Sequence, residues 1–173
     1  SITILVYLRW ILDNYINLRP VKYYPGAYSP LQNPEGIDFC IIRENSEGMY
    51  PGREGDLSWL AKAISGYRDP FGRPLDYYGE GKFALRLITQ KGTERIARYA
   101  VELVRQRKSR GFPGKVTCIT KANVLRQSCG LFRKIVEEEV RKISDVHYEH
   151  LYVDDAARRL IRFPREFDVI VTS

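Results

Sequence analysis

The sequence lacks any apolar run of the roughly 18 residues that a membrane-spanning helix requires. Its most apolar stretch, ITILVYLRWIL, is interrupted by Arg9 and followed by Asp13. This stretch also lacks the basic start and the small-residue cleavage site of a signal peptide. Zinc-ligand spacings, a P-loop and a GxGxxG motif are absent, as are internal repeats and low-complexity segments. We therefore expect an ordinary soluble globular chain with no membrane partner.

Cysteine is scarce, and histidine is scarcer. Cys40, Cys118 and Cys129 are odd in number and have no metal-ligand spacing, so free thiols in a reducing cytoplasm are the simplest interpretation. His147 and His150 are three residues apart, which on a strand would place them on opposite faces. We expect these two histidines to be structural rather than metal-binding.

The length of 173 residues is sufficient for one domain with a real core, and 44% of the residues are apolar. The formal charge of +7 is compatible with nucleic acid, a membrane surface or small anionic substrates. A nucleic-acid-binding domain is disfavoured, because no stripe of aromatic residues or recognised binding motif accompanies the charge. One segment, 91–110, is rich in basic residues: Lys91, Arg95, Arg98, Arg105, Arg107, Lys108 and Arg110. This basic face could touch phosphates, and a solvated helix face explains it equally well.

Both ends of the sequence suggest a piece of a longer chain. Met49 is the only methionine, and the chain begins at Ser1. The final segment, FDVIVTS, stops one residue after a pattern typical of a buried strand. We therefore expect further residues on either side.

The periodicity of apolar residues predicts the order of the elements. A helix is expected over 4–16, closing near Asn17 because Pro20 disfavours helix just before it. Strands are expected at 39–42, 82–90, 115–120, 146–153 and 168–172, and helices at 93–108, 131–143 and 155–161. Residues 51–82 are rich in glycine and proline, which indicates loops or an extended arm. Alternating strands and helices predict an α/β fold with a largely parallel sheet.

Reactive side chains gather behind the strand FCII, in the stretch RENSEGMY. Arg43 opens it, and together with Arg9 and Arg19 it could bind a polycarboxylate, because guanidinium groups grip carboxylates in a bidentate fork. Taken singly, these arginines are more readily explained as surface residues, although the almost wholly apolar neighbours of Arg9 make that explanation weaker for it. Tyr50 closes the stretch and could be a general acid, although packing of its ring at a strand end is the commoner role.

Two further groups follow predicted strands, where open α/β sheets place their active residues. Lys121 and Asn123 follow KVTCIT, with a solvated lysine as the alternative. Asp154 and Asp155 follow VHYEHLYV. Aspartates there can hold Mg²⁺ or Mn²⁺, or can cap the next helix. Both interpretations would hold together if Asp154 were a metal ligand and Asp155 were the helix cap.

These segments together resemble the metal-dependent β-decarboxylating dehydrogenases, which include isocitrate, 3-isopropylmalate, homoisocitrate and tartrate/D-malate dehydrogenases. The resemblance rests on four segments in family order: LRWILDNYINLRPVKYYPG, DFCIIRENSEGMY, ITKANVLRQSCGLFRKIVEEE and YVDDAARRLIRFPREFDVIVT. It implies an isocitrate/isopropylmalate dehydrogenase-like α/β fold, in which a small domain has a mixed sheet, helices and a dimer-clasping arm. Residues 1–16 would belong to the larger domain, and 17–173 would form the smaller one with its arm at about 51–82.

The resemblance also implies roles for single residues. Arg9, Arg19 and Arg43 would grip the substrate carboxylates, and Asn123 would lie beside substrate and nicotinamide. Tyr50 would protonate the enol. Lys121 would handle the proton of the substrate hydroxyl. Asp154 would bind Mg²⁺ or Mn²⁺. The lysine and the aspartate would reach across from a second subunit, so a homodimer with shared active sites and NAD or NADP as cofactor is implied.

Substrate choice stays open within the family. Thr3 and Leu5 stand where isocitrate enzymes usually have serine and asparagine, and Leu5 with Val6 would suit an isopropyl group. The motifs RENSEG and YYPG point back to isocitrate, and tartrate or D-malate is equally open. The family also continues beyond FDVIVT into a segment with two further metal aspartates, so this chain alone would have an incomplete metal site. A catalytically inactive subunit of the same fold is a further alternative.

Overall fold

The computed structural model describes residues 4–173, apart from the side chains of residues 5 and 6. The chain divides into two compact units. The first, here called the sheet unit, comprises Ser1–Glu47 and Ile88–Ser173. The second, here called the hairpin unit, comprises Gly48–Leu87.

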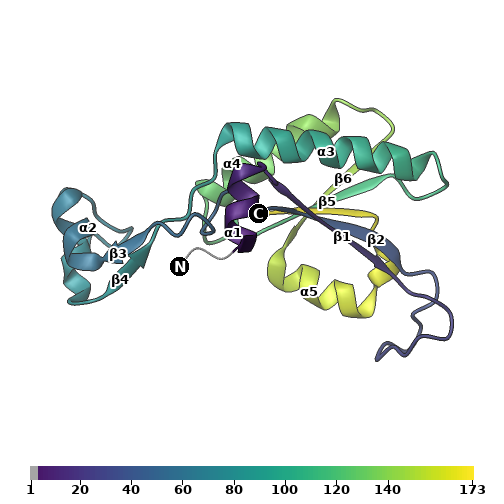
Figure 1. Ribbon diagram of the computed structural model, residues 1–173, viewed down its shortest axis with the longest axis horizontal. Helices are drawn as coiled ribbons and strands as arrows, with labels where there is room; N and C mark the ends of the chain where they lie inside the picture. Colours follow the sequence, from purple (N-terminus) through teal and green to yellow (C-terminus); the bar gives the residue numbers. More distant parts are fainter. Residues whose placement is uncertain (1–3) are drawn as a thin grey trace. The chain divides into compact units, whose positions relative to one another are not determined.

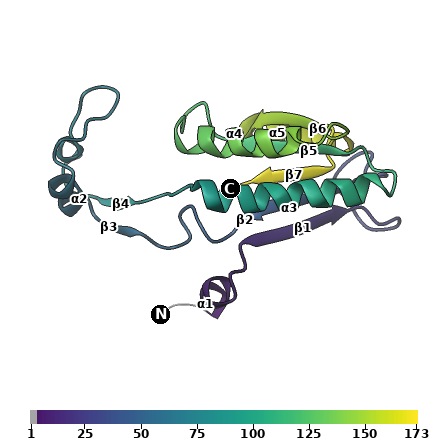
Figure 2. The ribbon, with the colours of Figure 1, turned by 90° about the horizontal axis from the view of Figure 1, so that it is seen from above.

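A five-stranded sheet forms the centre of the sheet unit, in the order β1-β2-β7-β5-β6 (Figures 1 and 2). Only β1 runs antiparallel to its neighbour, β2; the other pairs are parallel. The strands are β1 (Ile16–Lys22), β2 (Asp38–Glu44), β5 (Lys115–Thr120), β6 (His147–Tyr152) and β7 (Val169–Thr172). The predicted α/β class with a mixed sheet is therefore confirmed.

Two helices, α3 (Gln90–Lys108) and α4 (Ser128–Arg141), cover one face of the sheet (Figure 1). Thr89 starts α3 as its N-cap, because its side chain accepts a hydrogen bond from the Gly92 N–H. The helices pack their apolar stripes on the alternating side chains of the strands. The fully buried residues of this core include Ile42, Ile96, Val104, Val116, Phe132, Val136, Val169 and Val171.

The opposite face of the sheet packs against α5 (Val153–Arg162) (Figure 1). Phe39 and Ile170 from the strands contact Ala156 of this helix in a second, smaller core. Two successive strand residues, Ile41 and Ile42, belong to opposite cores, as the two-residue period of a strand requires. A 3-10 turn, Pro164–Glu166, then leads into β7.

The amino-terminal helix is shorter than the sequence predicts. Helix α1 spans Ile4–Ile11, and β1 already begins at Ile16 (Figure 2). The expected continuation to Asn17 is wrong: Asp13 has a φ of 46°, which no right-handed helix accommodates. Pro20 lies instead in an edge strand, where it costs no ladder hydrogen bond. Thr3 lies outside the described residues, as do the side chains of Leu5 and Val6, so the substrate expectations placed on them stay predictions.

The hairpin unit contains more regular structure than the loops or extended arm that the sequence predicts. Its strands β3 (Glu54–Asp56) and β4 (Lys82–Ala84) pair antiparallel, and α2 (Leu57–Ala63) and a 3-10 helix (Leu75–Tyr78) lie between them in sequence. The rings of Trp59 and Phe83 stack with centroids 5.9 Å apart. The strand expected over 82–90 is confined to β4, because helix α3 already begins at Gln90.

The three cysteines are free thiols, as the sequence predicts, and the structure shows that all three are buried. Burial raises the pKa of the Cys118 thiol to about 12. Among the described helices, none is long and apolar enough to cross a membrane.

A buried ion pair joins α3 to the sheet, and it removes Arg107 from the exposed basic face that the sequence predicts over 91–110. Arg107 is only 9% exposed, and its Nε lies 2.5 Å from Oδ1 of Asp168, which is fully buried. Its Nη2 donates to the carbonyl of Asp38 at 2.7 Å. Asp168 Oδ2 accepts from the backbone N–H of Gly114 at 2.8 Å and of Lys115 at 3.2 Å.

We expect Asp168→Ala to lower the free energy of unfolding by about 3–5 kcal/mol, because it removes the closer of the two carboxylates that pair with the buried Arg107 charge and leaves two backbone N–H groups without their acceptor. Urea denaturation of both proteins measures this loss. Asp145→Ala is the matched control, since Asp145 pairs with Lys108 at the exposed surface and its removal should shift the midpoint little. Equal losses for both variants would contradict the dependence of the fold on Asp168.

Candidate active site

The carboxyl ends of β5 and β6 bring two of the predicted site residues together. These strands are parallel, and Thr120 pairs with Tyr152 at their ends. Lys121 follows β5 directly, and Asp154 lies in the first turn of α5. The Nζ atom of Lys121 donates to Oδ1 of Asp154 at 2.7 Å. Both side chains are accessible to solvent, so a ligand could reach the pair.

Asp154 has the properties of a hard-cation ligand. The hydrogen bond from Lys121, together with a backbone hydrogen bond, holds its pKa below the usual range, so the carboxylate stays ionised at neutral pH. Oxygen ligands of this kind suit Mg²⁺ or Mn²⁺. No cluster of three or more acidic, histidine or cysteine side chains that could hold a metal ion occurs within the described residues. Asp154 therefore fits a divalent cation as one ligand out of several.

Asp155 does not cap α5, contrary to the sequence expectation. Tyr152 occupies the N-cap position, and no side chain bonds there. Asp155 instead lies inside the first turn, where its carboxylate accepts from Arg158 Nη2 at 2.7 Å and Arg159 Nε at 2.9 Å. Asn123 lies exposed in the turn after β5, and the Lys121 carbonyl accepts from the N–H of Leu125 to close that turn.

A second group, formed by Arg19 and Arg43, lies on β1 and β2. Arg43 pairs with Asn17 across the ladder, and Arg19 pairs with Ile41, so both arginines are on the sheet face that α5 covers. Diagonal neighbours in such a pair have Cα atoms about 7–8 Å apart. Arg19 Nε donates to Asn17 Oδ1 at 2.8 Å, and Arg43 Nη2 donates to Asn45 Oδ1 at 2.9 Å.

The two groups lie at the same edge of the sheet but not side by side. Arg43 is at the carboxyl end of β2, as Lys121 is beyond that of β5. Strand β7 lies between β2 and β5, and adjacent strands are about 4.8 Å apart, so roughly 10 Å separates these two strands. Arg9 is half-buried on α1, which precedes the end of β1 that faces the carboxyl end of β2.

Tyr50 belongs to the hairpin unit and is exposed, next to the turn in which the Gly52 N–H donates to the Met49 carbonyl. The two acids that precede it have structural roles. Glu44 is buried and accepts from Ser46 Oγ at 2.6 Å and from the Glu47 N–H at 2.7 Å. Glu47 accepts from the Thr89 N–H at 3.0 Å and from its hydroxyl, at the start of α3.

Asn45 and Arg95 contact the predicted site region, although the sequence did not single them out for it. Arg95 Nη1 lies 2.8 Å from each carboxylate oxygen of Asp13, and its Nη2 donates to Ser46 Oγ at 2.5 Å. Its guanidinium also lies over the ring of Tyr15, 4.1 Å from the centroid. Asp13 and Arg95 are 82 residues apart, and no local pattern indicates that they meet.

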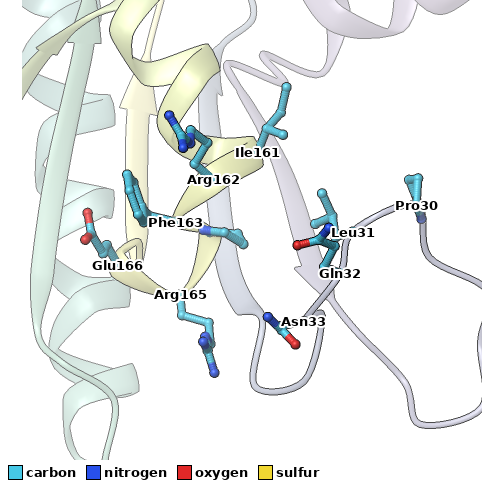
Figure 3. A pocket seen from close by; sticks show the side chains of 10 residues that line it. Pro30, Leu31, Gln32, Asn33, Ile161, Arg162, Phe163, Arg165 and Glu166 are labelled. Atoms are coloured by element: carbon cyan, nitrogen blue, oxygen red, sulfur yellow. The ribbon is translucent and has the colours of Figure 1, made fainter.

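A cavity of about 580 Å³ lies at the opposite end of the sheet, between the loop before β2 and the segment that joins α5 to β7 (Figure 3). Gln32 and Asn33 line one side, and Phe163 and Arg165 line the other. None of the predicted site residues lines this cavity.

The sequence has many relatives. Residues 1–173 match the family described as isocitrate/isopropylmalate dehydrogenase. The chain is 41% identical to a 3-isopropylmalate/3-methylmalate dehydrogenase of Methanocaldococcus jannaschii, over 98% of this chain and 44% of that protein. It is 36% identical to a 3-isopropylmalate dehydrogenase of Corynebacterium glutamicum, with the same coverage of 98% and 44%. The chain thus spans less than half the length of these relatives.

Two solved structures resemble the fold along almost the whole chain. The crystal structure of isocitrate dehydrogenase from Methylococcus capsulatus gives a TM-score of 0.77 at 28% identity, covering 99% of this chain and 44% of that one. The TT0538 protein from Thermus thermophilus gives a TM-score of 0.76 at 31% identity, covering 99% and 30%.

The contacts of Glu44 predict that it supports the fold. Glu44→Ala should lower the free energy of unfolding by about 2 kcal/mol, because the Ser46 and Glu47 donors lose a charged acceptor. Thermal or urea denaturation measures the loss, with the exposed Glu35→Ala as the matched control. A stability equal to that of the control would contradict this structural role.

Proposed function

The chain belongs to the isocitrate/isopropylmalate dehydrogenase family, and from this premise we propose that the complete protein oxidises and decarboxylates a malate-type 2-hydroxy acid. The proposed cofactors are NAD⁺ or NADP⁺ and Mg²⁺ or Mn²⁺. A substrate similar to 3-isopropylmalate is favoured, since two relatives at 41% and 36% identity are named for it. Isocitrate, tartrate and D-malate are the alternatives within the family.

The observation that supports this proposal best is the Lys121–Asp154 pair beyond two parallel strands. An ammonium group and an ionised carboxylate in contact, both accessible to solvent, provide a proton-transfer group beside a cation ligand. An ordinary surface salt bridge would explain the contact between Lys121 and Asp154. It would not account for the position of both residues at the sheet edge where α/β enzymes bind their ligands.

Arg19 and Arg43 would hold the substrate carboxylates, with Arg9 as the third cation. Their neighbouring positions on one face of β1 and β2 support this role, because a planar guanidinium binds a carboxylate through two parallel hydrogen bonds. Bidentate binding fixes the orientation of the acid, which favours breaking the C–C bond to the carboxylate that leaves as CO₂.

Lys121, in its neutral amine form, would take the proton of the substrate hydroxyl as the alcohol becomes a ketone. Loss of CO₂ then leaves an enol, and the Tyr50 hydroxyl would donate the proton that its carbon requires. Asp154 would be one ligand of the divalent cation, and Asn123 would lie beside the nicotinamide. When bound, NAD(P)⁺ accepts the hydride and the cation draws electron density from the substrate oxygens.

The proposal includes a homodimer with shared active sites. The separation of the two residue groups by β7 supports it, since Lys121 and Asp154 would then complete the site of a second subunit. An inactive subunit of the same fold is less well supported, because Tyr50 and Lys121 are both present.

Reduction of NAD⁺ and NADP⁺ by the complete protein with Mn²⁺ tests the function. We expect turnover of one acid among 3-isopropylmalate, isocitrate, tartrate and D-malate, with loss of activity on metal chelation. A folded dimer that turns over none of them would favour the inactive-subunit alternative. Salt-dependent retention on DNA, together with that result, would favour nucleic-acid binding.

The proposed roles of two residues can be tested singly. Lys121→Ala and Tyr50→Phe should each reduce kcat by roughly 10²–10⁴-fold, the usual contribution of an acid–base group. Steady-state kinetics measures this loss, and Lys134→Ala is the control because that lysine pairs with Glu138 at the surface. A change below about threefold would remove the residue in question from the mechanism.

A further inference from the structure

We propose that Asn45 is a positioning residue for Arg43, and that it ties this arginine to the segment that follows α1. This inference rests on the proposed function, in which Arg43 binds a substrate carboxylate. Asn45 itself is 5% exposed and would not touch the substrate.

Three hydrogen bonds hold Asn45 in place. Its Oδ1 accepts from Arg43 Nη2 at 2.9 Å, and its Nδ2 donates to the carbonyl of Asn14 at 3.1 Å. Its backbone N–H donates to the carbonyl of Tyr15 at 2.9 Å. Since a guanidinium only donates and a carbonyl only accepts, these partners also determine which way the amide points.

The segments on both sides of Asn45 are held together by Arg95. This arginine binds the carboxylate of Asp13 in the turn after α1 and the hydroxyl of Ser46 after β2. Asp13 has a φ of 46°, a left-handed conformation that is uncommon for a residue other than glycine. The Arg95 contacts therefore hold the turn in the position that gives Asn45 its two carbonyl partners.

The consequence for Arg43 is a restricted orientation. The five N–H donors of a guanidinium lie in one plane, so a bond at Nη2 limits how that plane can turn. An arginine side chain that is already ordered loses less entropy when it binds a carboxylate. Asn45 would thereby strengthen substrate binding without contacting the substrate.

Asn45 also connects Arg43 to the helix that carries Arg9. The Asn14 N–H donates to the Arg9 carbonyl at 2.9 Å, and the Asn14 carbonyl accepts from Asn45. A short chain of hydrogen bonds therefore runs from the backbone of one proposed carboxylate-binding arginine to the side chain of the other. Asn45 would thereby hold Arg9 and Arg43 in a fixed position relative to each other, so that both can bind the same substrate.

The test measures KM and kcat of the complete protein with its preferred hydroxy acid. Asn45→Ala should raise KM for the acid about tenfold, the effect expected for loss of a hydrogen bond to a charged group, with a smaller change in kcat. The KM for the dinucleotide should stay within about twofold, because Arg43 holds only the acid. The exposed Asn33→Ala is the matched control and should leave every constant unchanged.

A second background separates positioning from general support of the fold. In Arg43→Lys, which lacks the Nη2 donor, Asn45→Ala should add less than about twofold to KM, because coupled residues are not additive. Multiplicative increases in KM would overturn the assignment, as would an unchanged KM in Asn45→Ala. If Asn45→Ala does not fold, Asn45→Asp serves instead; its carboxylate would compete for Arg43 and should also raise KM for the acid.

The outcomes distinguish this inference from the proposed function. An active wild-type protein whose KM is insensitive to Asn45 overturns the positioning role alone. A wild-type protein that turns over none of the four acids contradicts the proposed function, and the positioning role falls with it.

Discussion

The buried ion pair between Arg107 and Asp168 is the constraint on which the arrangement of the sheet unit depends. Asp168 precedes the central strand β7, and its second oxygen accepts from the backbone at the start of β5. Arg107, in the last turn of α3, also binds the carbonyl of Asp38 at the start of β2. One charge pair thus gathers the amino ends of three parallel strands under one helix. Because these strands are short and parallel, setting one end also sets the other, where Arg43 and Lys121 lie.

The carboxyl edge of the sheet carries two separate groups of polar side chains instead of one compact site. Lys121 and Asp154 meet because β5 and β6 are adjacent and parallel. Arg19 and Arg43 are neighbours because β1 and β2 are adjacent and antiparallel. Strand β7 ends in Val171 and Thr172 and adds no charged residue between the groups. This division is physically consistent with sites that are completed by a second subunit, as the proposed function requires.

The stretch from Arg43 to Glu47 shows how one short segment serves both structure and the proposed chemistry. Glu44 and Glu47 use their carboxylates to hold a turn and the start of α3. Asn45 uses its amide to hold Arg43. Within this stretch, Arg43 alone is proposed to contact substrate. A cation that must keep one orientation requires neighbours whose own hydrogen bonds are satisfied, and this explains the concentration of polar residues there.

The sequence by itself determined the α/β class, most of the strands and helices, the family and the candidate residues at strand ends, because these follow from local periodicity and from contiguous motifs. It misplaced the end of α1 and missed β1, since the edge position that tolerates Pro20 is a property of the sheet order. It also placed Arg107 on an exposed basic face and offered Asp155 as one candidate for the helix cap, and the structure contradicts both. Only the tertiary structure decided which distant groups meet: Arg107 with Asp168, Arg95 with Asp13, and the Asn45 side chain with the Asn14 carbonyl. The partners in the first two pairs are 61 and 82 residues apart, and contacts over such separations arise from packing, which no local pattern encodes.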